Sequence, residues 1–558
     1  MKAKCLSGVA VLAFVISGLR VGGQAQTFNI LFNFDGRSEE PFVMSLIQGR
    51  DGNFYGTTLA GGTENLGTVF KITPSGTMTT LYSFCSQFQC SDGTHPYAAL
   101  VLSTDGNFYG MTYSGGGGNC DFEYSGCGTI FKMAPDGALT TLHRFNLADG
   151  AAPWGALIQG IDGAFYGTTS EGGSNCLANG CGTIFRITSV GDFKTIYNFC
   201  SLPGCPDGFS PYGALVQASN GEFYGTSIGM VYKMGPSGLL TPLADLPGGL
   251  AYGGLTEGDE GTFYGASYEG GVNNVGTIFQ LTVPQTLTTL YSFCTALDCT
   301  DGELPIAPLV RGTDGNFYGT TLYGGTPFNC NGIGCGTIFS VTPSGSVTTL
   351  HSFCAQPGCK DGLGIFGGLF QATNGIFYGA TLNGGSNDLG LIYSLDMGLA
   401  PFVAFVRDSG FVGGTGGILG QGFTGATKVL LDGAPVEFAI ASDTFIKAKV
   451  PFGAKTGFVT VTTPSGILTS NKPFHVRPQL LSFDPPSGPP GTQVTITGVS
   501  LTQTLGVGFG DRTPAQFTVN SDTSVTATVP QGAKAGKIGI ETKGGVAISS
   551  GTFEVTTK

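Results

Sequence analysis

The sequence has little charge, one tryptophan and no apolar run long enough to cross a membrane after its N-terminal region. Only 11% of its 558 residues are charged, and the net charge is −12. A negative chain excludes nucleic acid as an expected partner, because phosphate binding needs a positive surface. No later stretch approaches the ~18 uninterrupted apolar residues of a membrane helix. Hydrophobic residues still reach 41%, which excludes a disordered chain.

Motifs of common enzymes are also missing. The sequence has no H-E-x-x-H, no phosphate-binding G-x-x-x-x-G-K-S/T and no C-x-x-C motif. It has four histidines, and His95 and His143 stand alone near predicted strand ends or loops, where histidine is more often structural than catalytic. We therefore assign no catalytic residue, no cofactor and no metal from the sequence.

Residues 1–25 have the pattern of a secretory signal. Lys2 and Lys4 precede the apolar stretch Val9–Ile16, and small residues end the segment before an expected cleavage after Ala25. Its removal takes the net charge from −12 to −15, because the segment carries three basic residues and no acidic one. We expect an exported protein of the extracellular space, the cell surface or the periplasm, with no transmembrane segment in the mature chain.

The remaining 14 cysteines fall into seven neighbouring pairs, six with four residues between them and one with six. An even number in an exported chain predicts disulfides that close short loops. Zinc is the competing interpretation, but it needs four convergent ligands, and no histidine lies at ligand spacing from a pair. The predicted disulfides are Cys85–Cys90, Cys120–Cys127, Cys176–Cys181, Cys200–Cys205, Cys294–Cys299, Cys330–Cys335 and Cys354–Cys359.

The motif D/N/E-G-x-F-Y-G occurs seven times and is the strongest signal in the sequence. The copies begin at Asp51, Asp105, Asp162, Asn220, Glu260, Asp314 and Asn374, with offsets of 54, 57, 58, 40, 54 and 60 residues. Periods of this size indicate a repeat architecture. Glycine makes up 95 of the 558 residues, which favours turns and strands over long helices.

Each unit contains four short segments rich in β-branched and aromatic residues. In the second unit they are residues 97–102, 108–112, 128–133 and 139–145, and tight turns containing D-G join the first to the second and the third to the fourth. Such segments are typical of antiparallel strands. Seven four-stranded units predict a seven-bladed β-propeller over residues 26–397, with a linear solenoid as the alternative.

The two ends of the repeat region predict that the ring closes. The seventh unit ends at Leu395 without a fourth strand, while Phe28–Phe34 matches the fourth strand Leu287–Phe293 of another unit. We expect Phe28–Phe34 to complete the last blade, because this removes an exposed sheet edge.

The repeat unit resembles that of a bacterial family. Over about residues 27–397, the unit is similar to the Gloeobacter/Verrucomicrobia-type tandem repeat of exported proteins. The motifs that carry the similarity are D-G-N-F-Y-G-T-T, G-T-V/I-F-K and T-T-L-Y-S-F. The resemblance implies export and a repeat fold, and it implies no activity. The fourth unit lacks the Gly-Gly doublet and is the shortest, so we expect a minimal blade there.

The last 160 residues change character. Residues 478–557 begin with a P-P-S-G-P-P-G segment and contain V-P-x-G-A-K-x-G, which also occurs 79 residues earlier, at 450–457. These segments resemble tandem IPT/TIG domains, which implies two immunoglobulin-like β-sandwiches, at 400–477 and 478–557. The resemblance also implies a role as spacers or interaction domains. The expected fold is all-β, a seven-bladed propeller followed by two immunoglobulin-like sandwiches.

All seven cysteine pairs map to one face of such a ring. They lie between blades or between the second and third strands, whereas tight turns occupy the opposite face. Cross-linked loops favour a preorganised binding surface. The alternative, which explains the disulfides equally well, is that long loops of an exported protein need cross-links for stability.

The same face offers aromatic candidates for ligand binding. Each first strand opens at the channel mouth with a bulky residue, which is Ile306 in the sixth unit. Stacking on the apolar faces of sugars or on aliphatic ligands is the functional hypothesis, with Trp154 as the best candidate. Packing between blades is the alternative. The candidates are Phe42, Tyr97, Trp154, Tyr212, Tyr252 and Phe366.

Six aspartates precede glycine in the loops between blades. A ring of carboxylates at this rim is a candidate for cation binding or acid–base chemistry, and Asp-Gly is also ordinary turn chemistry. The residues are Asp35, Asp92, Asp149, Asp207, Asp301 and Asp361.

The sequence favours a non-catalytic recognition protein, secreted or on the cell surface, that binds polysaccharide through the loop-rich face. A surface protein is the other expected partner, and we expect a monomer. The alternative is a propeller lyase or hydrolase acting on a glycan or lactone, because such enzymes share short D-G-containing repeats.

Overall fold

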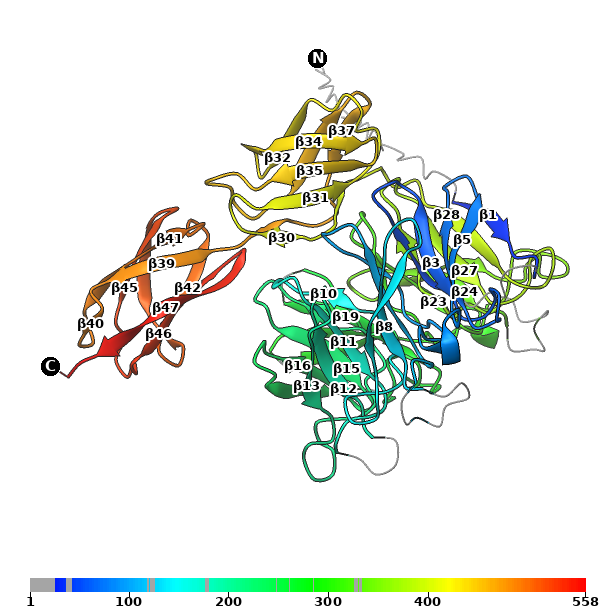
Figure 1. The fold of residues 1–558 in the computed structure, drawn as a ribbon, viewed down its shortest axis with the longest axis horizontal. Coiled ribbons are helices and arrows are strands. Elements are labelled where there is room, and N and C mark those ends of the chain that lie inside the picture. The colour runs from blue at the N-terminus through cyan, green and yellow to red at the C-terminus, as the bar shows by residue number, and fades with distance from the viewer. Residues whose placement is uncertain are drawn as a thin grey trace, which may run out of the picture.

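The computed structural model describes residues 26–36, 43–117, 120, 126–175, 180–246, 248–259, 261–284, 286–325, 330 and 334–557. The predicted signal segment, residues 1–25, lies outside them. The described residues form strands and two short 3-10 helices, η1 (Phe88–Cys90) and η2 (Leu297–Cys299), and no α-helix. None of these helices is long and apolar enough to span a membrane. Figure 1 shows a propeller and two sandwiches.

Seven four-stranded antiparallel sheets, the blades, form the propeller. Blade 1 contains β2 (Val43–Gln48), β3 (Phe54–Thr58), β4 (Thr68–Ile72) and β5 (Met78–Ser83). Blade 2 contains β6 (Val101–Leu102), β7 (Phe108–Thr112), β8 (Thr129–Met133) and β9 (Leu139–Arg144). Blade 3 contains β10 (Ile158–Gln159), β11 (Phe165–Thr169), β12 (Thr183–Ile187) and β13 (Phe193–Asn198). Blade 4 contains β14 (Val216–Gln217), β15 (Phe223–Ser227), β16 (Met230–Met234) and β17 (Leu240–Asp245).

The other three blades follow the same order. Blade 5 contains β18 (Leu255–Glu257), β19 (Thr262–Ser267), β20 (Thr277–Thr282) and β21 (Thr286–Ser292). Blade 6 contains β22 (Val310–Arg311), β23 (Phe317–Thr321), β24 (Thr337–Val341) and β25 (Val347–Ser352). Blade 7 contains β26 (Phe370–Gln371), β27 (Phe377–Thr381), β28 (Leu391–Asp396) and β1 (Thr27–Asn33). The first strand of each blade lies innermost, and these strands contact one another across blades, as β18 contacts β14 and β22.

The N-terminal strand completes the ring, as the sequence predicts. β1 pairs antiparallel with β28, from Thr27 opposite Asp396 to Asn33 opposite Leu391. It therefore supplies the outer strand of blade 7. Phe34, the residue after β1, is buried, so side-chain packing and backbone pairing both hold this segment in place.

The Phe and Tyr of the repeated motif join neighbouring blades. Tyr109 of blade 2 stacks on Phe165 of blade 3, with ring centroids 3.9 Å apart. Tyr378 of blade 7 packs on Phe54 of blade 1 at 4.4 Å. The other five contacts are Tyr55–Phe108, Tyr166–Phe223, Tyr224–Phe263, Tyr264–Phe317 and Tyr318–Phe377. Because these contacts return to the first blade, the repeats form a closed ring and not a linear solenoid.

The acidic residue and the last glycine of the motif have structural roles. Asp105 accepts hydrogen bonds from the N–H of Asn107, at 3.0 Å, and from the hydroxyl of Tyr109, at 2.8 Å. A Cβ atom at Gly110 would lie 2.5 Å from the Phe131 ring, so glycine leaves the space that this ring fills. The motif therefore builds the blade.

Blade 4 is complete although its repeat is the shortest. Ile228 and Gly229 alone join β15 to β16, and Gly229 has φ +84°, which glycine adopts without strain. The blade is minimal in the length of this loop and not in its number of strands.

Two sandwiches follow, with similar strand orders. In the first, one sheet contains β29 (Ala404–Phe405), β31 (Thr415–Leu419), β35 (Phe445–Lys449) and β34 (Glu437–Ser442). The other contains β33 (Ala434–Pro435), β32 (Lys428–Leu431), β36 (Val459–Thr463) and β37 (Gly466–Thr469). β30 (Ser409–Gly410) pairs parallel with β38 (His475–Val476).

In the second sandwich, one sheet contains β39 (Gln479–Asp484), β41 (Gln493–Val499), β45 (Ser524–Thr528) and β44 (Gln516–Ser521). The other contains β40 (Ser487–Gly488), β47 (Gly545–Val555), β46 (Gly536–Thr542), β42 (Thr504–Phe509) and β43 (Thr513–Pro514). Each sandwich has its own hydrophobic core. The predicted fold class, a propeller followed by two immunoglobulin-like sandwiches, is confirmed.

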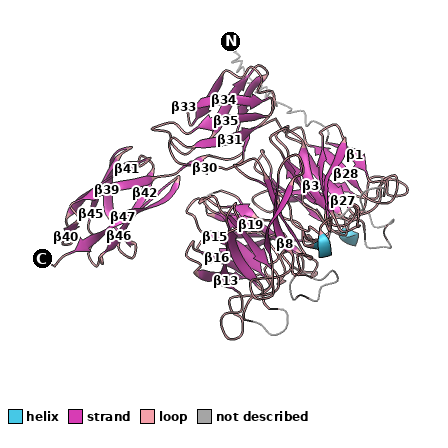
Figure 2. Ribbon diagram, viewed as in Figure 1, coloured by secondary structure: helices cyan, strands magenta, loops and turns pink. Residues whose placement is uncertain are grey.

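The first sandwich lies against the face of the propeller that carries the tight turns. The Thr444 hydroxyl donates a hydrogen bond to the carbonyl of Arg50, at 2.7 Å, and Arg477 donates one to the carbonyl of Ile161, at 3.2 Å. Figure 2 shows η1 and η2 on the side of the propeller away from this sandwich. The loop-rich face is therefore not covered by the sandwiches.

Candidate functional site

Disulfides fix the loops of the uncovered face. The structure contains Cys85–Cys90, Cys120–Cys127, Cys200–Cys205, Cys294–Cys299, Cys330–Cys335 and Cys354–Cys359. The seventh predicted pair includes Cys176, which lies outside the described residues. Cross-links of this number are typical of proteins that fold outside the cytosol.

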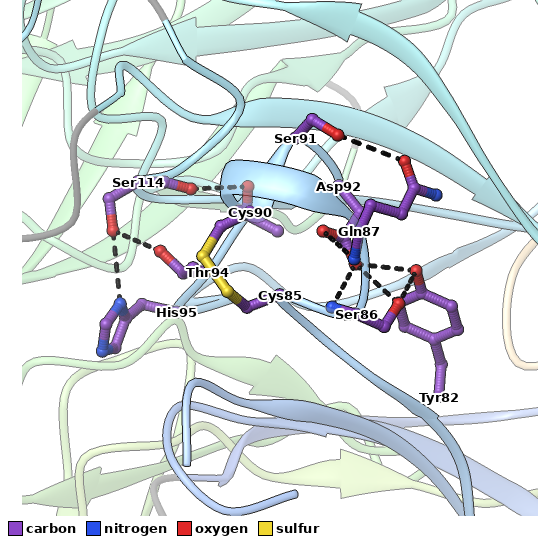
Figure 3. Close-up of a disulfide and its surroundings, with 11 residues drawn as sticks. Tyr82, Cys85, Ser86, Gln87, Cys90, Ser91, Asp92, Thr94, His95 and Ser114 are labelled. Carbon is purple, nitrogen blue, oxygen red and sulfur yellow. Dashed lines mark hydrogen bonds between the residues drawn. A yellow bond between two sulfur atoms is a disulfide. The ribbon is translucent and has the colours of Figure 1, made fainter. Parts of the chain in front are cut away.

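Asp92 binds several groups of its own loop from a buried position (Figure 3). Its Oδ2 atom accepts hydrogen bonds from the hydroxyl of Tyr82, at 2.7 Å, and from the N–H and hydroxyl of Ser86, both at 3.0 Å. The carboxylate is buried beside the Cys85–Cys90 disulfide. Burial, supported by the hydrogen bond to Asp92, raises the pKa of Tyr82 to about 12. The loop is therefore held by a carboxylate as well as by a covalent bond.

The equivalent aspartates act in the same way, so the carboxylates predicted as rim ligands have hydrogen-bond partners in their own loops. Asp207 and Asp301 each accept a tyrosine hydroxyl, at 2.7 and 2.6 Å, and the N–H of a loop residue. Asp149 and Asp361 accept loop N–H groups and face histidine nitrogens, 3.2 and 3.3 Å away. Asp35 is exposed. The other five carboxylates point into their own loops, because the loop donors need acceptors there.

Aromatic side chains from five blades meet at the channel mouth on this face. Trp154 stacks on Tyr97 with centroids 4.4 Å apart and lies 5.8 Å from Tyr212. It also reaches Tyr252 and Phe366, at 6.1 and 6.3 Å. All five side chains are half-buried. They contact one another at the mouth, whereas packing between blades is done by the Phe and Tyr of the repeated motif.

Two further tyrosines extend this cluster and are not among the sequence candidates. Tyr113 lies 5.2 Å from Tyr97 and 6.0 Å from Trp154, and Tyr268 lies 5.4 Å from Tyr252. Both directly follow a second strand. Alignment of the seven copies on F-Y-G places them at the same position, and this is the signal that identifies them.

The channel below the cluster is narrow. Small residues that shortly precede the first strands, among them Ala99, Ala156 and Ala214, line a cavity of about 100 Å³. At roughly 10–15 Å³ of water-accessible volume per water molecule, the cavity has room for several waters. Ile306 is buried at the wall, and Phe42 lies outside the described residues.

Glu171 gives the mouth a negative charge. Burial and the nearby Glu171 carboxylate raise the pKa of Tyr113 to about 12. The same two causes raise the pKa of Tyr212. Both tyrosines therefore stay protonated at neutral pH and can donate hydrogen bonds at the mouth.

The sequence also contains one G-x-S-x-G spacing, Gly225–Gly229, which belongs to blade 4. Ser227 ends β15, and its buried hydroxyl meets no hydrogen-bond partner in the part of the chain that the structure describes. A catalytic serine of this motif sits on a turn from a strand to a helix. Here β15 leads into the strand β16, so the spacing is not a nucleophile elbow.

Two disulfides lie side by side in blade 6. The sulfur atoms of Cys330, Cys335, Cys354 and Cys359 all lie within 4.8 Å of one another. The spacing of the pairs in the sequence does not reveal this convergence. Zinc binds thiolates, and in this structure all four sulfurs are in disulfides.

The family models agree with the geometry. Residues 19–228 and 227–428 match the Gloeobacter/Verrucomicrobia repeat. The chain belongs to this family. Residues 478–556, which contain the second sandwich, match the IPT/TIG domain. No curated protein matches the chain.

Solved structures align with this Gloeobacter/Verrucomicrobia repeat protein at low similarity. A streptogramin B lyase is 16% identical, with a TM-score of 0.45 over 66% of this chain and 97% of that chain. A fungal alcohol oxidase in complex with copper is 12% identical, with a TM-score of 0.43 over 93% and 98%. A surface glycan-binding protein from Prevotella bryantii is 17% identical, with a TM-score of 0.22 over 26% and 38%. At these TM-scores none of them assigns a function.

Proposed function

We propose that this protein is an exported, non-catalytic recognition protein that binds polysaccharide at the mouth of its propeller. The observation that carries the proposal is the Trp154 cluster, in which five half-buried rings from five blades meet on the uncovered face. Aromatic rings stack on the apolar faces of sugars. The hydroxyls of Tyr113 and Tyr212 and the carboxylate of Glu171 supply polar groups for sugar hydroxyls beside them.

The loops around the mouth support this proposal because they are rigid before any ligand arrives. Four of the loops between blades are each held by a disulfide and by a buried aspartate. A preorganised surface loses less conformational entropy on binding than a mobile one. In this proposal residues 26–397 bind the ligand in the extracellular space, at the cell surface or in the periplasm. The sandwiches, residues 400–477 and 478–557, serve as spacers on the opposite side.

The single tryptophan makes the proposal directly testable, because all tryptophan fluorescence comes from Trp154. We expect a soluble polysaccharide that binds the mouth to shift or quench this emission. A glycan array identifies the polysaccharide, and Trp154→Ala should abolish binding on the same array. Phe452→Ala is the matched control, because Phe452 is 72% exposed and lies on the first sandwich.

Equal binding by wild type and Trp154→Ala would place the site elsewhere, and binding to no glycan would remove the proposal. Release of product from polysaccharide or lactone substrates would replace recognition by the lyase or hydrolase alternative. In that case Trp154→Ala and Phe452→Ala are compared by their rates of product release.

A further inference from the structure

A second hollow lies on the opposite face of the propeller, between its turns and the first sandwich. This interdomain chamber has a volume of about 1190 Å³. Glu257 and Arg311 line it from blades 5 and 6, and Asp408, Lys472 and His475 line it from the sandwich. The side chains of Asp408 and Lys472 are 39% and 55% exposed, so the chamber is open to solvent. Ligand sites often form at such domain interfaces.

The chamber contains a departure from the repeat. In four blades the first strand ends in a glutamine whose Oε1 atom accepts an N–H from the turn of the preceding blade. Gln217 of blade 4, for example, accepts the N–H of Ile161 of blade 3, at 2.8 Å. The four residues are Gln48, Gln159, Gln217 and Gln371. These glutamines therefore hold one blade to the next.

Blades 5 and 6 have charged residues at this position. Arg311 of blade 6 still binds the preceding blade, through the carbonyl of Gly258, at 2.8 Å, and the carboxylate of Asp259, at 2.7 Å. Within the described residues, Glu257 of blade 5 does not bind the preceding blade. Among the described residues, none donates a hydrogen bond to the Glu257 carboxylate, and none forms an ion pair with it. Burial raises its pKa, against the opposing effect of Lys472.

A partly buried carboxylate without a direct partner destabilises the fold. The other copies show that glutamine fits this position and makes a useful hydrogen bond there. In the copies with glutamine, the residue at this position stabilises the fold, whereas Glu257 destabilises it. A destabilising residue at such a position is a sign of a functional site. Lys472, Arg311 and His475 act on Glu257 only through space, so its position points to a ligand that binds the carboxylate directly.

The other charged side chains of the chamber named here already have an ion-pair or hydrogen-bond partner. Arg311 binds Asp259, and Lys472 binds Asp408 at 3.0 Å. Asp314 accepts the hydroxyl of Tyr318, at 2.9 Å, within its own turn. In the described parts of the chain, Glu257 belongs to no cluster of three or more potential metal ligands. An organic amine is therefore a better direct partner for the Glu257 carboxylate than a metal ion.

We propose that the interdomain chamber binds a small organic cation with neighbouring hydroxyl groups, which is the chemistry of an amino sugar. Glu257 is the counter-ion of the amine. The side chains of Asn471 and His475, which also line the chamber, offer hydrogen bonds to the hydroxyls. This inference is independent of the polysaccharide site at the mouth, because the two sites lie on opposite faces.

The test uses isothermal titration calorimetry on the full chain with four probes. These are glucosamine, a β-1,4-linked glucosamine trimer, N-acetylglucosamine and glucose. We expect the two amines to bind and the two neutral sugars not to bind. Glu257→Gln should weaken binding of the trimer by roughly 10- to 100-fold, because a charge-assisted hydrogen bond is lost. Trp154→Ala should leave it unchanged.

Glu437→Gln is the matched control, because it removes the same charge from an 80% exposed side chain of the first sandwich. It should bind the trimer as wild type does. The melting temperature of Glu257→Gln should be no lower than that of wild type, which shows that the variant folds. The inference is overturned if N-acetylglucosamine binds as tightly as glucosamine, if neither amine binds at millimolar concentration, or if Glu257→Gln binds like wild type or melts lower.

Discussion

On the loop face of the propeller, the recurring aspartates bind their own loops, while varied residues that shortly precede the first strands form the Trp154 cluster. On the turn face, recurring glutamines bind the preceding blade, while Glu257 stands in the chamber without a direct partner. On both faces the residues that recur hold the fold, whereas the Trp154 cluster and Glu257, which differ between copies, face an open space. In this ring, function is best sought where the copies differ.

This comparison predicts the largest loss of stability when a recurring ring is removed. Phe165 is fully buried and stacks on Tyr109 of the neighbouring blade. Phe165→Ala should lower the free energy of unfolding by about 3–5 kcal/mol, because it leaves a cavity between blades. Denaturant unfolding measures the loss. Trp154→Ala removes a larger but half-buried side chain and should lose less than half as much, so equal losses would contradict the comparison.

A recurring aspartate should have the next largest effect. Asp207 is buried and accepts hydrogen bonds from Tyr197, at 2.7 Å, and from the N–H and hydroxyl of Ser201, both at 2.7 Å. Asp207→Ala leaves these donors unpaired and should lower the free energy of unfolding by about 2 kcal/mol at pH 7.

The effect of Asp207→Ala should also depend on pH. Burial opposes ionisation of Asp207, but its hydrogen bonds prevail and lower its pKa. Its stabilisation is therefore fully present above the ordinary aspartate pKa, near 3.9. The stabilisation is lost as the pH falls through the lowered value of the folded state. The stability difference between wild type and Asp207→Ala should shrink below about pH 4, and a difference that stays constant down to pH 2 would count against this account.

Glu257→Gln should change stability in the opposite direction. Burial raises the pKa of Glu257 above its ordinary value of 4.5, although Lys472, Arg311 and His475 counteract the rise and Asp408 adds to it. Between the two values the folded state holds a proton that the unfolded state has lost, so wild-type stability falls as the pH rises through this window. Glu257→Gln should therefore melt about 1–3 °C higher than wild type at pH 7. Thermal melts at pH 4 should show the gain disappear, and a gain that persists there would exclude ionisation of Glu257 as its cause.

Much of the fold can be predicted from the sequence, because each structural feature of the blade is specified by a short sequence motif. The Phe and Tyr of F-Y-G make the contact between blades, and D-G forms the turn. Cysteines five residues apart can reach one another within one loop. The closing strand Phe28–Phe34 is also identified by its likeness to other fourth strands. Seven copies of a short-range pattern are enough to specify the ring.

The candidate site is predicted only in part, because its contacts link different blades. The sequence identifies Trp154 and Tyr97 but not that their rings stack, since 57 positions separate them and side-chain direction is not encoded in spacing. It also assigns the rim aspartates a possible ligand role, whereas the loop donors occupy them. The interdomain chamber forms where the first sandwich lies against the propeller. No repeat pattern in the sequence specifies how the sandwich is placed.

The smallest effect is expected where one recurring side chain replaces another. His351 of blade 6 stands where three other blades have a tyrosine facing the loop aspartate. It lies 3.3 Å from Asp361, and its ring stacks on Phe28 of the closing strand at 4.1 Å. The corresponding tyrosines are Tyr82, Tyr197 and Tyr291.

His351→Tyr should therefore change the free energy of unfolding by less than about 0.5 kcal/mol. The new hydroxyl can reach Asp361 as the other tyrosines reach their aspartates, and the new ring can stack on Phe28. His351→Ala is the comparison variant and should lose more, because it removes both contacts. If denaturant unfolding shows equal losses for the two variants, His351 does not belong to the recurring scaffold. It would then join Trp154 and Glu257 among the residues whose differences between copies mark a function.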